Sequence, residues 1–494
     1  MGLLEVKNLS FKYDNQIENI FNNVSFNIDT NWKLGLIGRN GKGKTTLLDL
    51  LMSKYRYQGY ITPNYCFEYF PYDIKDKSMF TLDIVNEIVL DFELWQLQRE
   101  LSLLEVEDDV LWRPFETLSN GEQTKVMLAA LFLKPHDLLL IDEPTNHLDL
   151  HGRVLLSNYL KKKKSFILVS HDRNFLDNCI DHVLALNRDS IDIIKGNFTT
   201  WYQQKENQDN LEIKKNEKLK KDIKKLQVSA RQTGIWSDKV EKSKNTRVSG
   251  IKPDKGYVGH KAAKMMQRSK NLQRRQNKAV EEKKGLLKDI ETIEPLKMQP
   301  INSAKHKLVN FENVSITYEN RTIVKNINFS INQGERINLS GANGSGKTSI
   351  IKLIVNEDAN YQGKVTISPH LKIAYLSQSD EHLKGTLDDY IINEDLDHSL
   401  FKTILRKLDF SRDLFTQDIS TFSKGQKKKV MLANCLATPA NLYIFDEPLN
   451  YLDIFTRIQI EEVILKYQPT LLFVEHDQYF CNAIKTKTIN LSND

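Results

Sequence analysis

The segment GRNGKGKT, residues 38–45, decides the fold. It follows an apolar run at 33–37 that predicts a strand, and it precedes a helix-forming run at 46–51. In this context glycines let backbone N–H groups turn toward phosphate oxygens, Lys44 can reach the outer phosphates, and Thr45 can hold Mg²⁺. The segment therefore predicts a phosphate-binding loop between a strand and a helix of an α/β domain.

The same pattern recurs as GANGSGKT at residues 341–348. Three more motifs keep a spacing of 303 to 305 residues: LSNGEQ (118–123) matches FSKGQK (422–427), LLLIDEP (138–144) matches LYIFDEP (442–448), and SHD (170–172) matches EHD (475–477). Four ordered motifs at one spacing indicate a duplication. The expected fold class is therefore α/β, with two P-loop NTPase domains.

Two apolar runs, 138–141 and 442–445, read as buried parallel strands, and each ends in Asp-Glu. An aspartate at such a strand end can hold Mg²⁺, and the next glutamate can orient or deprotonate the water that attacks a γ-phosphate. Acidic residues after a strand are often only helix N-caps, but the preceding phosphate loop favours catalysis. The expected metal-side residues are Asp142 and Asp446, and the expected catalytic residues are Glu143 and Glu447.

The cysteines and the terminal sequence indicate the compartment. The four cysteines are widely separated and form no CxxC pair, so neither a zinc site nor a disulfide framework is expected. The N-terminal segment lacks a secretory pattern, and no stretch reaches the roughly 18 apolar residues that span a bilayer. A cytoplasmic protein is expected.

The stretch 205–291 differs in composition from both repeats. It holds 25 Lys or Arg and 12 Asp or Glu, a net charge of +13, whereas the whole chain has a net charge of +6. Its sparse apolar residues predict two long helices with one narrow seam, and a break at 244–259 would close them into a hairpin about 50 to 60 Å long. The residues expected in this seam are Leu219, Ile223 and Leu226 and then Met265, Leu272, Leu286, Ile290 and Ile293. The expected domains are a first cassette at 1–204, a basic helical-hairpin linker at 205–298 and a second cassette at 299–494.

The motifs resemble those of ATP-binding-cassette proteins. LSNGEQ is similar to the signature motif, LLLIDEPTNHLD to Walker B with its D-loop, and SHDRNFL to the switch-histidine segment. Two cassettes on one chain, a charged helical linker and the absence of a membrane-spanning stretch resemble the ABC-F family of ribosome-associated translation factors. The resemblance covers essentially the whole chain. It implies two ABC-type cassettes, ATP and Mg²⁺ as cofactors, and a monomer whose cassettes pair with each other.

The resemblance also implies which residues meet the nucleotide. Ser119 and Gly121 would face the nucleotide held by Lys347 of the second cassette. Ser423 and Gly425 would face the nucleotide held by Lys44 of the first. His171 and His476 would contact the γ-phosphates, as further catalytic residues. The expected nucleotide-binding residues are Tyr13, Gly38, Asn40, Gly41, Gly43, Lys44, Thr45, Thr46, Ser119, Gly121, Glu122, Tyr318, Gly341, Asn343, Gly344, Gly346, Lys347, Thr348, Ser349, Gln378, Ser423, Gly425 and Gln426. The expected metal-site residues are Thr45, Asp142, Thr348, Gln378 and Asp446.

Some positions depart from the family pattern. The first half has Tyr72 where the second has Gln378, which puts metal coordination at the first site in doubt. The second signature carries Phe422 and Lys424, and PLNYLD and EHD replace PTNHLD and SHD. Because both Glu143 and Glu447 remain, two hydrolytic sites of unequal rate are expected.

The basic linker predicts a nucleic-acid partner, although a solvated spacer is the plainer alternative. The resemblance implies an arm that enters the tRNA exit site of the large ribosomal subunit, beside 23S rRNA and P-site tRNA. The chain is similar to the Lsa-type antibiotic-resistance branch, which protects ribosomes from lincosamides, pleuromutilins and streptogramin A compounds. The residues expected at the drug-site tip are Lys244, Arg247, Lys252, Lys255 and Tyr257.

Three other classes remain open on the sequence. A transporter ATPase subunit would not need a basic hairpin of this length. A chromosome or repair ATPase would carry longer coiled coils or zinc-binding insertions inside its cassettes. A general translation factor that acts on stalled ribosomes is the strongest alternative to a resistance factor.

Overall fold

The computed structural model divides the chain into two compact units. One unit is formed by Met1–Trp201 together with Ile293–Asp494, and the other by Tyr202–Thr292. The domain boundaries expected at 204/205 and 298/299 stay predictions. The structure describes residues 2–14, 19–146, 148–187, 190–242 (side chains to 228), 260, 264, 267–268, 270–272, 274–275, 277–281, 294–303, 305–318 and 321–342 (without the side chains of 318 and 321), 344–355, 361–381 and 383–491.

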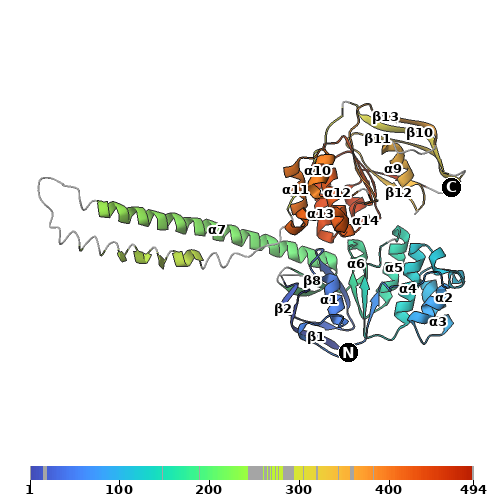
Figure 1. The fold of residues 1–494 in the computed structure, drawn as a ribbon, viewed down its shortest axis with the longest axis horizontal. Coiled ribbons are helices and arrows are strands. Elements are labelled where there is room, and N and C mark those ends of the chain that lie inside the picture. Colours follow the sequence, from blue (N-terminus) through green and yellow to red (C-terminus); the bar gives the residue numbers. More distant parts are fainter. Residues whose placement is uncertain are drawn as a thin grey trace. The chain divides into compact units, whose positions relative to one another are not determined.

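The first cassette is built on a six-stranded sheet in the order β5-β6-β7-β3-β8-β9 (Figure 1). All neighbours in it run parallel except β8 and β9. The central strands β6 and β7 are almost entirely buried and apolar, as expected for parallel strands covered on both faces. The strands are β3 (Lys33–Gly38), β5 (Phe67–Phe70), β6 (Leu138–Asp142), β7 (Phe166–Val169), β8 (His182–Leu186) and β9 (Ile191–Lys195).

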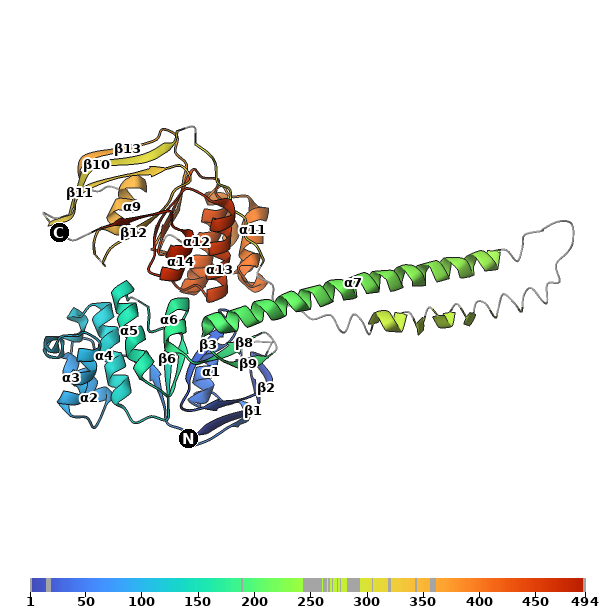
Figure 2. The same ribbon diagram turned by 180° about the vertical axis from the view of Figure 1, so that it is seen from behind.

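A second, antiparallel sheet packs near the N-terminus in the order β2-β1-β4 (Figure 2). Its buried residues form one core with α1 and with the parallel sheet. This core fixes the position of α1 directly after β3. The elements are β1 (Leu3–Phe11), β2 (Phe21–Asp29), β4 (Gln58–Ile61) and α1 (Lys44–Leu51).

The remaining helices of the first cassette follow the sequence between and after the strands. They are α2 (Thr81–Ile88), α3 (Leu94–Leu103), α4 (Asn120–Leu133), α5 (Leu150–Lys162) and α6 (Arg173–Cys179), with 3₁₀ turns at Asp108–Trp112 and Phe115–Thr117.

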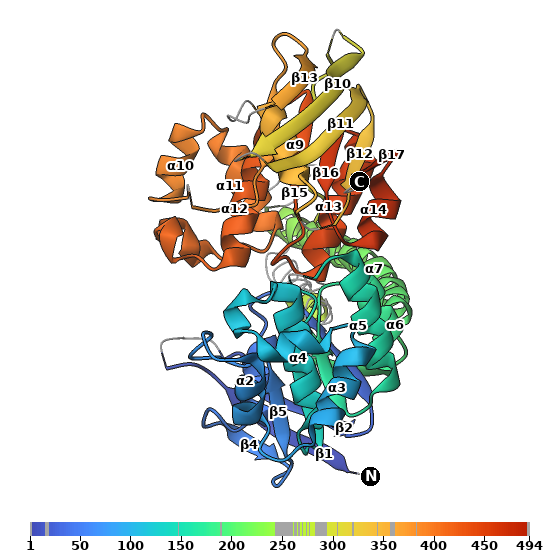
Figure 3. The ribbon, with the colours of Figure 1, turned by 90° about the vertical axis from the view of Figure 1, so that its right-hand side faces the viewer.

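The second cassette repeats this plan, as the duplicated motifs predict (Figure 3). Its parallel sheet has the order β14-β15-β16-β12-β17, and its antiparallel sheet has the order β11-β10-β13. Its strands are β10 (Lys307–Tyr318), β11 (Arg321–Asn332), β12 (Arg336–Ser340), β13 (Tyr361–Ile367), β14 (Ile373–Leu376), β15 (Leu442–Asp446), β16 (Leu471–Val474) and β17 (Lys487–Asn490). Its helices are α9 (Lys347–Val355), α10 (Leu387–Asn393), α11 (His398–Lys407), α12 (Lys424–Ala437), α13 (Ile454–Tyr467) and α14 (Gln478–Ile484), with 3₁₀ turns at Arg412–Thr416 and Ile419–Thr421.

The unit Tyr202–Thr292 contains most of α7, a helix of 45 residues from Phe198 to Lys242. The part of α7 within the expected linker, residues 205–242, is about 57 Å long at 1.5 Å per residue, which agrees with the expected length of the arm. Ile223 is buried, and Leu219 and Leu226 are partly shielded, which agrees with a narrow apolar seam. The described residues between 260 and 281 are also helical, but Leu272, expected in the seam, is 47% exposed. No helix among the described residues is long and apolar enough to cross a membrane.

The cassettes differ in one buried contact behind the ends of their central strands. In the first, Thr145 Oγ1 lies 3.3 Å from Ser170 Oγ. In the second, Leu449 and Glu475 occupy these places, and Glu475 accepts hydrogen bonds from the backbone N–H of Leu449 at 3.2 Å and of His476 at 2.7 Å. The replacement of PTNHLD by PLNYLD and that of SHD by EHD therefore include two changes that contact each other, and we expect them to compensate each other.

Replacing Glu475 with serine should lower the free energy of unfolding by about 1 to 3 kcal/mol, because the buried Leu449 N–H loses its acceptor. Adding Leu449→Thr should recover part of that loss by restoring the hydroxyl pair. Denaturant unfolding of both single variants and the double variant measures this coupling. Glu381→Ser, which removes an exposed carboxylate from the same cassette, is the control. Additive effects of the two changes would contradict the compensation.

Candidate functional site

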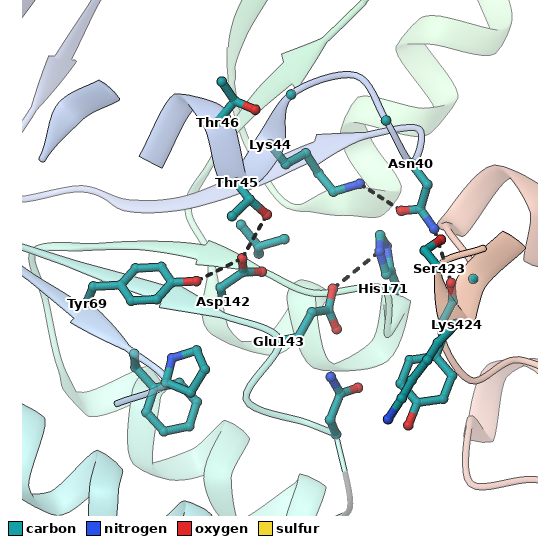
Figure 4. A pocket seen from close by; sticks show the side chains of 18 of the residues that line it. Asn40, Lys44, Thr45, Thr46, Tyr69, Asp142, Glu143, His171, Ser423 and Lys424 are labelled. Carbon is teal, nitrogen blue, oxygen red and sulfur yellow. Dashed lines mark hydrogen bonds and ion pairs between the residues drawn. The ribbon is translucent and has the colours of Figure 1, made fainter. Parts of the chain in front are cut away.

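The expected functional side chains of the first cassette gather at the carboxyl edge of its parallel sheet. The loop 39–43 follows β3, Asp142 ends β6, and His171 follows β7. These groups are brought together because β7 pairs with both β3 and β6. Together with Ser423 and Gly425 of the second cassette they line one pocket (Figure 4).

The phosphate loop has the backbone that its sequence predicts. Gly41 and Gly43 have φ values of 80° and 90°, in the left-handed region that glycine adopts without strain. A Cβ on Gly43 would lie 2.6 Å from Ile20 Cγ2, so a larger residue does not fit there. Gly344 and Gly346 repeat this conformation in the second loop, at 79° and 87°.

Lys44 is buried where this loop enters α1. Its Nζ donates hydrogen bonds to the carbonyl oxygens of Gly38 at 2.8 Å and Arg39 at 3.3 Å, and to Asn40 Oδ1 at 3.2 Å. Burial lowers the pKa of Lys44, and three nearby carboxylates, led by Asp453, oppose the shift. The ammonium therefore lies inside the loop, bonded to neutral oxygen atoms that a phosphate oxygen can replace.

The second loop holds its lysine in the same way. Lys347 Nζ donates to the carbonyl oxygens of Gly341 and Ala342, both at 2.8 Å. Burial lowers the pKa of Lys347, and Glu447 and Asp446 oppose the shift, as does Asp149 of the first cassette. Ser349 lies in α9 after this loop. The side chain of Tyr318 and all of Asn343 lie outside the described residues.

An oxygen donor set suited to Mg²⁺ lies beside each lysine. Thr45 Oγ1 donates to Asp142 Oδ2 at 3.1 Å, and Thr348 Oγ1 donates to Asp446 Oδ2 at 3.3 Å. Burial raises the pKa of both aspartates, and in Asp446, where the carboxylate of Glu447 adds to the shift, it rises to about 6. A hydroxyl and a carboxylate are ligands that Mg²⁺ accepts when phosphate oxygens and water supply the rest. The residues present therefore fit this ion.

Glu143 and His171 face each other in the first site. His171 Nε2 lies 3.3 Å from Glu143 Oε1, but the angle leaves that buried oxygen without a hydrogen bond. Burial raises the pKa of Glu143, and the carboxylate of Asp142 adds to the shift. Burial also lowers the pKa of His171 well below its usual range. The pair thus combines a carboxyl group whose pKa is moved toward neutrality with a neutral imidazole.

Glu143 and Glu447 share a strained backbone. Their φ values are 50° and 48°, in a region that non-glycine residues rarely adopt. Each backbone N–H donates to a neighbouring strand, to Val169 O at 2.9 Å and to Val474 O at 3.0 Å. The same conformation recurs at other corresponding pairs, such as Asn8 with Asn313, so it marks a shared backbone geometry and not by itself a function.

The two glutamates have different surroundings. Glu447 Oε2 accepts hydrogen bonds from Gln378 Nε2 at 2.9 Å and from Asn450 Nδ2 at 2.7 Å. Tyr72 stands where the first cassette would carry the glutamine, but its hydroxyl is buried without a hydrogen bond, and its ring lies beside Lys134. The substitution therefore removes the amide group from the first site without putting another polar group in its place.

Tyr69, which was not among the expected site residues, contacts the aspartate of the first site. Its hydroxyl donates to Asp142 Oδ2 at 3.3 Å, and burial raises its pKa (Figure 4). The sequence signal was its place on β5, three residues before Tyr72. At another part of the pocket Tyr13 lies with its hydroxyl 3.1 Å from Thr46 Oγ1.

The two signature segments begin helices α4 and α12. Ser119 and Ser423 are N-caps whose hydroxyl oxygens accept from the backbone N–H of Glu122 at 3.2 Å and Gln426 at 3.3 Å. The side chains of Glu122 and Gln426 accept in return from the serine N–H groups, each at 2.8 Å. Glu122 and Gln426 thus complete capping boxes, while each serine keeps its O–H for a further acceptor.

Close contacts join the PLNYLD segment of the second cassette to the first phosphate loop. Asn40 Nδ2 donates to Tyr451 O at 3.1 Å, and the Asn40 N–H donates to Asp453 Oδ2 at 3.4 Å. A Cβ on Gly425 would lie 2.8 Å from Tyr451 O, so glycine permits this approach. Tyr451 and Asp453 belong to PLNYLD, yet which loop they touch depends on the pairing of the cassettes, which the motif does not specify.

Further polar contacts connect the cassettes away from the pocket. Arg173 forms an ion pair with Glu461 at 2.7 Å, and Arg39 pairs with Asp409. Asn174 Nδ2 donates to Gln478 Oε1 at 3.2 Å. Asn174 lies in the first turn of α6 and Gln478 in the first turn of α14, so these two helix starts contact each other.

Comparisons with known proteins agree with this architecture. The family model described as ABC transporter matches residues 21–146 and 324–450. The ribosome protection protein VmlR of Bacillus subtilis is 30% identical over 100% of this chain and 87% of its own length. ABC transporter F family member 5 of Arabidopsis thaliana is 27% identical over 83% of this chain and 56% of its own length.

A solved structure shares the fold. The archaeal ribosome recycling factor aABCE1, crystallised with the ribosomal stalk protein aP1, aligns with a TM-score of 0.63 and 19% identity, over 98% of this chain and 87% of its own. Both cassettes are thus recognised by sequence and by structure. The chain belongs to the ATP-binding-cassette family, in its ABC-F branch, and is an ATPase.

Proposed function

We propose that this ATPase binds the large ribosomal subunit and protects it from antibiotics of the peptidyl-transferase centre, namely lincosamides, pleuromutilins and streptogramin A compounds. The observation that carries the proposal is the 30% identity, along the whole chain, to a protein named for ribosome protection. The protein acts in the cytoplasm as a monomer whose cassettes pair with each other. The alternative is a general translation factor, and the drug experiment below distinguishes it from a resistance factor.

In the proposed hydrolysis, Glu143 and Glu447 position the attacking water and accept its proton. A raised pKa makes the ionised form of a carboxyl group a stronger base, which suits Glu143 to this role. His171 and His476, whose pKa values burial lowers, are neutral and can donate an N–H to the terminal phosphate. Mg²⁺ held by Thr45 with Asp142, and by Thr348 with Asp446, would neutralise phosphate charge.

The two sites hydrolyse ATP at unequal rates in this proposal. Two amides hold Glu447 in place, whereas the first site has neither the glutamine nor an equivalent hydrogen bond on Glu143 Oε1. In this proposal the nucleotide is bound by the two phosphate loops, by the tyrosine ring beside Thr46, and by the serines and glycines of the two signatures.

The proposed ribosome contact uses the basic linker. Lysines along the first half of α7 are exposed. Lys264, Arg268 and Arg274, in the described helical residues between 260 and 281, are exposed as well. Such side chains are suited to the phosphates of 23S rRNA and P-site tRNA. The proposed tip residues, Lys244, Arg247, Lys252, Lys255 and Tyr257, lie outside the described residues.

Replacing both Glu143 and Glu447 with glutamine should lower the rate of ATP hydrolysis by about 10²- to 10⁴-fold, since a general base is lost at each site. ATP binding should persist, and with ATP the variant should co-sediment with ribosomes. Phosphate release, nucleotide binding and sedimentation measure the three effects. Glu116→Gln, which alters an exposed carboxylate, is the control. Normal turnover in the double variant would refute the catalytic assignment.

Neutralising Lys264, Arg268 and Arg274 to glutamine should make ribosome binding less sensitive to salt. Each lost phosphate contact should reduce the slope of log affinity against log salt by about 0.7 to 0.9. Ribosome affinity measured over a range of KCl concentrations gives this slope. Glutamine at Lys75, Lys162 and Lys164, three exposed lysines of the first cassette, provides the matched control. If both triple variants kept the wild-type slope, the linker would be a spacer.

Replacing the tip segment 244–259 with a short Gly-Asn turn should abolish drug protection while leaving ATP hydrolysis nearly intact, because the segment supplies no proposed nucleotide contact. Minimum inhibitory concentrations of a lincosamide, a pleuromutilin and a macrolide would be measured at matched expression. Tyr257→Ala, which removes a surface worth about 1 to 3 kcal/mol if it stacks on a base, should affect some drugs more than others. Ribosome binding without any drug protection in the wild type would favour the general translation factor.

A further inference from the structure

The second signature helix, α12, starts with an unusual accumulation of positive charge. Its first six residues are KGQKKK, so Lys424 is the first residue of the helix and Lys427, Lys428 and Lys429 follow within the next turn. The N-terminal end of a helix carries a partial positive charge, and a cation is unfavourable there. An anion close to this end would relieve the repulsion.

Three of these four lysines are held by oxygen atoms. Lys427 pairs with Asp380 at 3.5 Å. Lys428 donates to the carbonyl of Ser377 at 3.1 Å, and Lys429 donates to the carbonyl of Leu408 at 2.6 Å. These three side chains therefore bind groups of their own cassette.

Lys424 has a different environment. Its ammonium lies 5.3 Å from the centre of the Tyr451 ring, and the residue is exposed. A cation–π contact at an exposed position is a weak interaction, which a stronger anionic partner would replace. Within the described residues, the contact recorded for Lys424 is this one with the Tyr451 ring.

Lys424 also lines the pocket that contains Lys44 and Thr45 of the opposite cassette. It lies on the side of this pocket where Asn40 and His171 are found, away from Tyr69 (Figure 4). His171 belongs to the part of the site proposed to meet the terminal phosphate. A long cationic side chain at this position can reach an anion there.

We propose that Lys424 binds the terminal phosphate of the nucleotide held by Lys44, from the opposite cassette, and so makes this site selective for ATP over ADP. The inference deepens the proposed function, because it rests on the nucleotide occupying this pocket. The corresponding residue of the first signature is Asn120, which is uncharged. The contribution is therefore specific to the site that carries Tyr72 in place of glutamine.

The test isolates the Lys44 site in a Lys347→Ala background and measures equilibrium binding of Mg·ATP and Mg·ADP. Lys424→Asn, which copies the first signature, should weaken ATP binding about tenfold, as expected for a lost hydrogen bond to a charged group. ADP binding should change less than twofold. Lys424→Arg should keep most of the ATP affinity, because it retains the charge and the donors.

Two controls accompany this experiment. Lys466→Asn removes another exposed lysine of the second cassette whose ammonium lies over a tyrosine ring, 5.6 Å from the centre of Tyr467, and it should leave ATP affinity unchanged. In a Lys44→Ala background, Lys424→Asn should leave ATP affinity at the remaining site unchanged.

Unchanged ATP affinity at the Lys44 site, or an equal loss of ATP and ADP affinity, would overturn the inference. These outcomes differ from failure of the proposed function. If the Lys44 site with native Lys424 bound no ATP, the assignment of the pocket would fail; if it bound ATP and the Lys424→Asn variant bound it equally well, only the role of Lys424 would fail.

Discussion

A buried ammonium group, that of Lys44 in one cassette and Lys347 in the other, is the constraint on which each site depends. A lysine in such a place loses water, and burial lowers its pKa. The phosphate loop offsets this loss with backbone carbonyl oxygens, and the ends of the central strands bring carboxylates close. The parallel sheet is what makes both possible, since its order places the loop strand next to the strands that carry the acidic and histidine residues.

The same constraint explains why the site needs two cassettes. A pocket open on one side would leave the lysine and the triphosphate in water, where charge interactions are weak. The second cassette contacts the first loop through Tyr451 and Asp453, and glycine at 425 lets the second signature lie close to Tyr451. Contacts such as Arg173 with Glu461 support this closure from outside the pocket. The two sites differ mainly around Glu143 and Glu447, where water would attack. The same fold is therefore compatible with different rates of ATP hydrolysis at the two sites.

Much of the fold and of the site was predictable from the sequence, because each motif is local. A glycine-rich loop, a strand that ends in Asp-Glu and a serine with its capping partner each specify their backbone within a few residues, and the repeat specified the second cassette. Tyr69 was missed because its role depends on the register between β5 and β6. Asp453 and Tyr451 were missed as partners of the opposite loop, because pairing of the cassettes involves surfaces far apart in sequence. The left-handed backbone of Glu143 and Glu447 was also missed, since nothing about glutamate indicates it.

The exchange of the Thr145–Ser170 hydroxyl pair for Leu449 and Glu475 has a consequence for the history of the duplication. In the second half Glu475 accepts from the Leu449 N–H, and leucine stands where the first half has the threonine that contacts Ser170. A serine at position 475 beside Leu449 would leave that buried N–H without its acceptor. The two halves have therefore become entrenched in separate solutions, and a segment copied from one half into the other by recombination would bring half of a contact with it.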